Sequence, residues 1–172
     1  MEKNSKKLWC LSYEMFSDLA RENKWNKSVP SNIAIISIIN SKDSNEGEKH
    51  ICKNADNVLN LTFDDASPVA FKAEALAETF ELGDGRTIHF FTPEMAKKSV
   101  EFIKKNKGKD FYIHCSAGIS RSQAFVRFIE DINHDIKWIT NPNNPCRYPN
   151  GFVYQRLMES YREDQNKQKY ER

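Results

Sequence analysis

Apolar and polar residues alternate along the chain in a way that predicts several short strands. The apolar run Ile33–Ile39 precedes the polar segment 40–49, which is typical of a buried strand that ends in a turn. Two further apolar segments, residues 58–63 and 111–113, also predict strands. For residues 74–80 the pattern does not distinguish a helix from a strand.

Helix signals lie between and beyond these strands. Ser12 precedes a segment with one apolar face that ends near Asn23, and the dipeptide Thr92-Pro93 marks a second helix start. The apolar segment 123–133 predicts a buried helix, and Asn150 is positioned to cap a last one. Because strands alternate with helices, the sequence predicts an α/β domain with a small, mostly parallel twisted sheet flanked by helices.

The length of 172 residues is sufficient for one domain with short additions at its ends. Residues 1–30 are expected to form a helical extension that packs on a domain of residues 31–162. The charged residues 163–172 are expected to form a frayed tail. Within the domain, residues 83–86 (Gly-Asp-Gly-Arg) lie between alternating apolar residues and predict a tight hairpin turn.

Composition and charge exclude several classes of protein. The 26 Lys and Arg residues nearly balance 24 Asp and Glu, so the net charge of +2 gives no argument for a nucleic acid or an anionic membrane as partner. Mean hydropathy is −0.72, and no apolar run is long enough for a membrane span. Ser12 and Glu14 interrupt the apolar residues near the N-terminus, so no signal peptide is expected.

The cysteines and histidines indicate a reduced, metal-free protein. The four cysteines are widely spaced and the four histidines are scattered, without the spacing of a zinc site. A chain of this size needs no disulfide framework, so the sequence predicts reduced thiols and a cytoplasmic location. The scattered cysteines and histidines predict no metal site, and no cofactor is expected.

One segment carries the candidate chemistry: His114-Cys115-Ser116-Ala117-Gly118-Ile119-Ser120-Arg121-Ser122, between a predicted strand and a predicted helix. The five residues between Cys115 and Arg121 are enough to wrap a loop around one tetrahedral anion, with backbone N–H groups directed inward. A thiol in such a field is largely ionised at neutral pH, so Cys115 is expected to be a thiolate nucleophile. The planar guanidinium of Arg121 can hold two phosphate oxygens. Gly118 allows the backbone to approach the ligand closely.

This segment resembles the signature loop of the cysteine-based protein tyrosine phosphatases, and residues 118–122 are especially similar to the dual-specificity branch. A second motif, residues 147–157, resembles the element that opens the last helix of that branch, although no residue separates Asn150 from Gly151 here. The two motifs lie within residues 111–160. The resemblance implies hydrolysis of a phosphorylated protein through a phosphocysteine intermediate.

The resemblance also implies a role for each side chain of the segment. Cys115 is the nucleophile, and Ser122 donates a hydrogen bond that helps the sulfur leave when the intermediate is hydrolysed. His114 orients the loop and tunes the thiol. The phosphate is bound by Arg121 and by the residues of the loop interior: Ser116, Ala117, Gly118, Ile119 and Ser120.

The chemistry of the family also requires a general acid that protonates the leaving oxygen and then activates water. Asp65, at the end of a predicted strand, is the favoured candidate, and the adjacent Asp64 is the reserve; the alternative for both is a polar turn. The stretch between Asp65 and Cys115 is longer than in compact members of the family, with the hairpin at 80–91 as the expected insertion. Asp84 in that hairpin is a weaker candidate.

Phosphoprotein phosphatase activity toward phosphotyrosine, with phosphoserine and phosphothreonine as further substrates, is the leading hypothesis. Phosphoinositides or RNA 5′-phosphates are alternative substrates, although residues 116–120 contain no lysine that would meet the extra phosphates of a lipid. A phosphate-binding pseudophosphatase would usually lack the Cys, the Arg or the Asp, all of which have candidates here. A redox enzyme of the arsenate reductase type would need a second cysteine near Cys115. The sequence specifies neither the substrate nor the oligomeric state.

Overall fold

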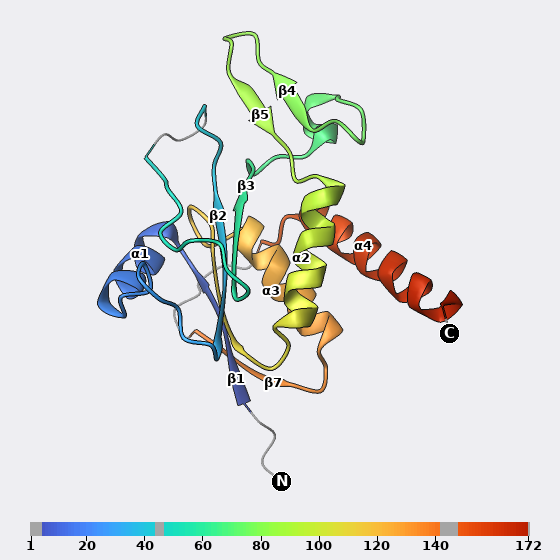
Figure 1. Cartoon of the computed structure of the whole chain (residues 1–172). Coiled ribbons are helices and arrows are strands. Elements are labelled where there is room, and N and C mark those ends of the chain that lie inside the picture. Colours follow the sequence, from blue (N-terminus) through green and yellow to red (C-terminus); the bar gives the residue numbers. More distant parts are fainter. Residues whose placement is uncertain (1–4, 44–46, 142–147, 172) are drawn as a thin grey trace.

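The computed structural model describes residues 5–43, 47–141 and 148–171, which form a layered α/β fold (Figure 1). At its centre lies a sheet in which every pair of neighbouring strands is parallel. In spatial order the strands are β3 (Val58–Thr62), β2 (Ile33–Ile39), β6 (Asp110–His114), β1 (Ser5–Leu11) and β7 (Lys137–Thr140). The predicted α/β class, with a parallel sheet flanked by helices, is confirmed.

Helices cover both faces of this sheet (Figure 1). Along β2, Ile33 and Ile35 pack in the cluster of helix α1, whereas Ile36 and Ile38 pack with the helices of the opposite face. Burial on both faces explains the uninterrupted apolar run of this strand. Among the described residues, no helix combines the length and the apolar character that a bilayer crossing requires. The helices are α1 (Tyr13–Glu22) on one face and α2 (Pro93–Lys105), α3 (Arg121–Ile132) and α4 (Gly151–Tyr170) on the other.

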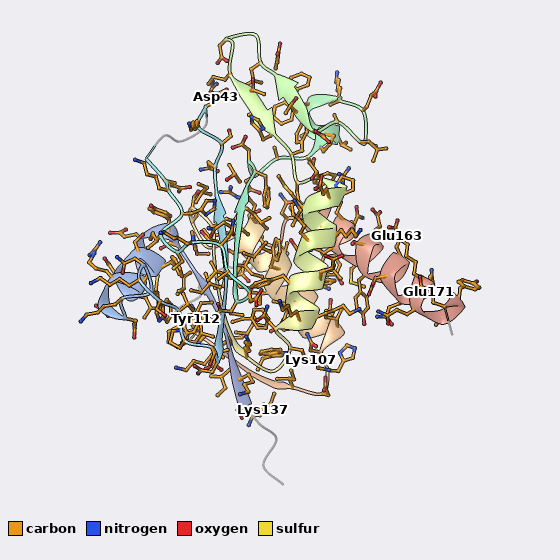
Figure 2. All side chains as sticks on the ribbon, in the orientation of Figure 1. Asp43, Lys107, Tyr112, Lys137, Glu163 and Glu171 are labelled. Carbon is orange, nitrogen blue, oxygen red and sulfur yellow. The ribbon has the colours of Figure 1, made fainter. Side chains whose placement is uncertain are left out.

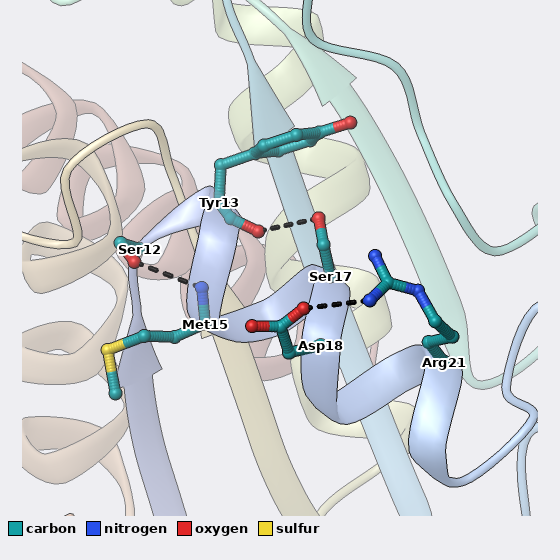
Figure 3. Close-up of polar contacts among 6 residues, drawn as sticks. All are labelled: Ser12, Tyr13, Met15, Ser17, Asp18 and Arg21. Carbon is teal, nitrogen blue, oxygen red and sulfur yellow. Dashed lines mark hydrogen bonds and ion pairs between the residues drawn. The ribbon is translucent and has the colours of Figure 1, made fainter.

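Side-chain caps begin three helices at the predicted residues. Ser12, Thr92 and Asn150 each accept a hydrogen bond from the N–H three residues later, at 3.2, 3.1 and 3.1 Å. Figure 3 shows the cap of α1 together with the ion pair between Asp18 and Arg21 on its exposed surface. The local signals at these helix starts therefore agree with the tertiary fold.

The N-terminal segment requires a correction. The helical extension expected for residues 1–30 is wrong in its first part, because Ser5–Leu11 is a strand inside the sheet, between β6 and β7. Only Leu8, Cys10 and Leu11 of this strand are buried, and its polar first half hides the strand pattern in the sequence. The domain therefore includes the N-terminal strand and does not begin at residue 31.

The C-terminal segment also differs from the expectation. Helix α4 continues to Tyr170, so residues 163–170 are helical rather than frayed (Figure 2). Neither Gly nor Pro follows Gly151 within the helix, and the pair formed by Lys104 and Asp164 joins α4 to α2. Because the last turns are exposed and polar, their composition resembles that of an unstructured tail.

The predicted hairpin stands at the carboxyl edge of the sheet, above the ends of β2 and β3 (Figure 1). The backbone N–H of Thr87 donates to Asp43 Oδ2 at 2.9 Å, which joins the hairpin to the segment that follows β2 (Figure 2). Residues 74–78 belong to neither a helix nor a strand. The elements of this segment are the 3₁₀ helix η1 (Pro68–Phe71) and the antiparallel strands β4 (Thr79–Glu81) and β5 (Thr87–His89).

Candidate active site

The carboxyl ends of four parallel strands meet at one edge of the sheet. Strand β6 ends at His114, and residues 115–120, termed the Cys115 loop, lead from there into α3. Ser12 follows β1, Asn40 follows β2, and residues 63–65 follow β3 at the same edge. Ligands of open α/β sheets bind outside the carboxyl ends of the strands. The sheet therefore gathers residues from distant parts of the sequence around the Cys115 loop.

The carbonyl groups of the Cys115 loop are held by the surrounding protein. Segments of α1, of α3 and of the chain before α4 donate hydrogen bonds of 3.0 to 3.3 Å to four of these carbonyl oxygens, those of Ser116, Gly118, Ile119 and Ser120. In a trans peptide, the C=O of one residue and the N–H of the next point in opposite directions. The N–H groups that follow these carbonyls are therefore directed toward the interior of the loop. Together with the first turn of α3, they form a set of donors that can bind an anion.

Gly118 allows the loop to approach strand β1. Its φ of +71° lies in the left-handed region, and a Cβ atom there would lie 2.7 Å from the carbonyl carbon of Leu11 and 2.8 Å from the nitrogen of Ser12. Both are backbone atoms that cannot move aside, so only glycine fits. The N-terminal strand is thus part of the framework of the site.

Cys115 is buried at the base of the loop, with 2% of its surface exposed. Its Sγ lies 3.0 Å from Ser122 Oγ, the hydroxyl expected to act on the sulfur. Cys10 Sγ also lies 3.0 Å from Ser122 Oγ, and it contacts Gly118 O at 3.4 Å. The sequence does not reveal this second cysteine at the site, because β1 is not predicted as a strand. Cys146 lies outside the described residues.

Arg121 is a buried cation, with 3% of its surface exposed. Its Nη1 donates to Phe63 O at 2.7 Å and its Nη2 to Ser116 Oγ at 2.9 Å. Its Nε is buried without a hydrogen-bond partner, and no carboxylate within the described part of the chain forms an ion pair with Arg121. Burial of a charge without a partner is costly. An anion bound in the adjacent loop would supply that partner.

Asp64 has a structural environment. Its carboxylate is 4% exposed and accepts hydrogen bonds from the backbone N–H and Oγ of Ser41, at 3.0 and 2.8 Å, and from the N–H of His89 at 2.8 Å. It thereby joins the segment after β2 to the hairpin. Asp84 is exposed in the hairpin turn, where it forms an ion pair with Arg86 at 2.8 Å.

Asp65 points to the Cys115 loop instead. Its Oδ1 accepts hydrogen bonds from Ser120 Oγ at 2.8 Å and from Asn150 Nδ2 at 2.7 Å. Asn150 also caps α4, so one amide links the start of this helix to the carboxylate. Of the two adjacent carboxylates, Asp65 is the one that is exposed and bonded to the rim of the loop.

Asn40 is a residue of the site that the sequence analysis does not identify. Its Nδ2 donates to Ser116 Oγ at 2.9 Å, the same hydroxyl that accepts from Arg121. Asn40 directly follows the strongly predicted strand β2. The rule that sites form at the carboxyl ends of parallel strands would have indicated it.

His114 is fully buried beneath the loop. Its ring stacks on Phe16, with 4.3 Å between the centroids, and its Nε2 lies 2.7 Å from Ser37 Oγ. Burial lowers the pKa of His114 to about 3, although an interaction with the backbone of Cys115 opposes this shift. At neutral pH the imidazole is therefore uncharged. It can orient the loop but cannot donate a proton as an imidazolium.

This burial predicts a pH dependence of stability. The unfolded chain binds a proton at His114 near pH 6.5, whereas the folded protein binds it only near pH 3, so the free energy of unfolding falls as pH decreases through this interval. The expected contribution of His114 rises toward about 1.4 kcal/mol per pH unit once the pH is below 6.5. Urea unfolding between pH 7 and 5 measures the slope, and His114→Gln should reduce it. The exposed His134, changed to Asn, should leave it unaltered; equal slopes for wild type and His114→Gln would contradict the expectation.

The described residues contain no group of three or more His, Cys, Asp or Glu side chains that could hold a metal ion.

Comparison of the chain with protein-family models, with curated proteins and with solved structures found no match in any of the three.

Proposed function

We propose that this protein is a cysteine-dependent phosphatase of the protein tyrosine phosphatase superfamily, similar to its dual-specificity branch. Its proposed substrate is a phosphorylated protein, with phosphotyrosine hydrolysed and phosphoserine and phosphothreonine as further targets. The observation that carries the proposal is the buried Arg121, which lacks an anionic partner among the described residues, beside the thiol of Cys115 and the inward N–H groups of the loop. This set provides a nucleophile and the donors for one tetrahedral dianion.

In the first step, the Cys115 thiolate attacks phosphorus. A P–S bond forms while the P–O bond to the leaving group breaks, and the carboxylic acid form of Asp65 protonates the departing oxygen. Arg121 and the loop N–H groups stabilise the negative charge on the three remaining oxygens. The products of this step are the free hydroxyl of the substrate, a phosphocysteine and the carboxylate of Asp65.

In the second step, the same carboxylate accepts a proton from water, whose oxygen attacks phosphorus as the P–S bond breaks. Ser122, 3.0 Å from the sulfur, donates a hydrogen bond that stabilises the thiolate as it leaves. Inorganic phosphate is released, and both the thiolate and the acid are regenerated. The reaction needs neither metal nor cofactor.

This proposed chemistry supports a cell compartment and a class of partner. A thiolate nucleophile requires reducing conditions, which supports a cytoplasmic location. Residues 116–120 contain no lysine, which favours a single phosphate over a polyphosphorylated lipid. We propose a phosphoprotein as the partner, with no nucleic acid and no membrane.

Hydrolysis assays with a metal chelator test the proposal, and Asp65→Asn makes them diagnostic. The wild type should release phosphate from phosphotyrosine and phosphothreonine peptides faster than from phosphoinositide vesicles or 5′-triphosphorylated RNA. Asp65→Asn should lower kcat for the peptides by about 10²–10³-fold, because the leaving oxygen is no longer protonated. For aryl phosphates with an acidic phenol the loss should be much smaller, since these groups leave without a proton.

The two neighbouring candidates for the acid serve as controls. Asp64→Asn should lower the Tm, because the buried carboxylate accepts three hydrogen bonds. Its effect on kcat should not depend on the leaving group. Asp84→Asn should alter neither property. A leaving-group dependence in Asp64→Asn would move the acid by one residue. If no substrate in the panel is hydrolysed, the proposed activity is wrong.

A further inference from the structure

Two consecutive hydrogen bonds connect the buried His114 to a second histidine nearer the surface. Ser37 Oγ lies 2.7 Å from His114 Nε2 and 2.8 Å from His50 Nδ1. At the other side of its ring, His50 Nε2 lies 3.2 Å from Thr62 Oγ1. Ser37 is fully buried, whereas His50 is half-buried and lines a hollow of about 540 Å³ at the ends of β2 and β3. The proposed nucleophile directly follows His114, so this series of hydrogen bonds leads to the Cys115 loop.

The hydroxyl of Ser37 limits how protons are arranged in the hydrogen bonds that join His114, Ser37 and His50. A hydroxyl has one proton to donate, so at most one of the two imidazole nitrogens beside it accepts that proton. The other nitrogen must carry an N–H that donates to Ser37 Oγ. In one arrangement, His114 Nε2–H donates to Ser37, which donates to His50 Nδ1. In the other, every donor is reversed: His50 Nδ1–H donates to Ser37, and Ser37 donates to His114 Nε2.

The second arrangement changes the tautomer of His114. When Nε2 accepts a hydrogen bond, the single proton of the neutral ring is on Nδ1. This nitrogen is buried and has no hydrogen-bond partner among the described residues. An orphaned N–H donor is less well tolerated in a protein interior than an orphaned acceptor. A neutral His50 therefore favours the first arrangement, with the His114 proton on Nε2.

We propose that Ser37 and His50 are positioning residues that form a relay, in which protonation of His50 transfers the proton of His114 from Nε2 to Nδ1. A protonated His50 carries N–H groups at both ring nitrogens and can no longer accept from Ser37. Ser37 then accepts from His50; if His114 Nε2–H also donated to it, the buried hydroxyl proton would be left without an acceptor, so this proton turns to His114 Nε2. A change of charge at His50 thus changes the tautomer of His114, next to the Cys115 loop, while His114 itself stays neutral.

The groups around both histidines are compatible with this relay. Lys42, Glu48 and Lys49 line the hollow beside His50, and the Glu48 carboxylate accepts from the N–H of Asn40. Burial lowers the pKa of His50 below its usual 6.5, so the relay would act only below that pH. Around His114 lie the rings of Tyr13 and Phe16 and the hydroxyl of Ser37, with Arg121 as the nearby cation that opposes a second positive charge.

Nitrogen-15 NMR of histidine-labelled full-length protein tests the relay without any assay of activity. As pH falls through the titration of His50, the ratio of Nδ1–H to Nε2–H in His114 should rise by at least about tenfold, because an orphaned buried polar group is costly. A His114 tautomer that does not change while His50 titrates would overturn the proposal. This outcome is independent of whether the protein is a phosphatase.

Variants separate the relay from a general effect of pH. His50→Asn retains an acceptor beside Ser37 but cannot be protonated, so His114 should keep its proton on Nε2 throughout. Ser37→Ala removes the link, and the His114 tautomer should no longer follow the titration of His50. The exposed His134, changed to Asn, should leave the wild-type behaviour intact. If the transition of His114 persists in Ser37→Ala, the relay is not its cause.

The consequence for Cys115 rests on the proposed function. A proton on His114 Nδ1 places the positive end of an N–H dipole in the residue that directly precedes Cys115. At a pH low enough to protonate His50, Cys115 should therefore be alkylated by iodoacetamide faster in the wild type than in His50→Asn. Equal rates, with the tautomer change intact, would show that the relay exists but does not reach the thiol.

Discussion

Cys115→Ser is expected to abolish phosphate release and to preserve phosphate binding. The hydroxyl occupies nearly the same volume as the thiol, so the N–H groups of the loop and the guanidinium of Arg121 remain in place. A serine hydroxyl is not ionised at neutral pH, and among the described residues no carboxylate or imidazole bonds to the side chain at position 115 to remove its proton. Loss of a covalent nucleophile lowers kcat by a factor on the order of 10⁵ or more. Calorimetry with a phosphotyrosine peptide should still detect binding.

Cys52 provides the matched control. It is a buried thiol, and burial raises its pKa to about 11. It is therefore protonated at neutral pH and is not expected to act as a nucleophile. Cys52→Ser should retain the kcat of the wild type. Turnover by Cys115→Ser in the presence of a chelator, or loss of turnover in Cys52→Ser alone, would contradict a mechanism through Cys115.

The central part of the fold is predictable because its signals are local. Strand β2 is buried on both faces and reads as seven consecutive buried residues, and the helix starts at Ser12, Thr92 and Asn150 carry their own capping side chains. Strands β1 and β7 lie at the other side of the sheet, with polar or exposed residues at many of their positions. Their pairing with the rest of the sheet depends on the fold as a whole, which a short polar segment does not reveal.

The site shows the same division between local and distant information. Cys115, Arg121 and Ser122 lie within eight residues, and their spacing alone indicates a loop around an anion. By contrast, Cys10 contacts Ser122 and Ser37 contacts His114 from other strands, more than 70 positions away. Such contacts follow from strand order. The choice between Asp64 and Asp65, which the sequence leaves open, likewise depends on which carboxylate meets the hairpin and which meets the loop.

Arg121→Lys is expected to lower kcat by at least about 100-fold, although the charge is retained. The guanidinium carries five N–H donors in a plane, and the contacts with Phe63 O and Ser116 Oγ use two of them. The remaining donors include the buried Nε, which has no partner among the described residues and is available to a bound anion. A lysine has a single nitrogen and cannot support the loop and bind two phosphate oxygens together. The loss is of the size found when a group that stabilises transition-state charge is removed.

Arg156 distinguishes this effect from the general cost of replacing a buried arginine. It is also buried, and it donates to the carbonyl oxygens of Phe91 and Ala75, away from the Cys115 loop. Arg156→Lys should lower the Tm and leave kcat close to that of the wild type, whereas Arg121→Lys should lower kcat in protein that remains folded. If Arg121→Lys loses stability but keeps its kcat, the guanidinium only holds Phe63 and Ser116 together. The unpaired Nε would then have no catalytic meaning, and the proposed phosphate site would lose its principal support.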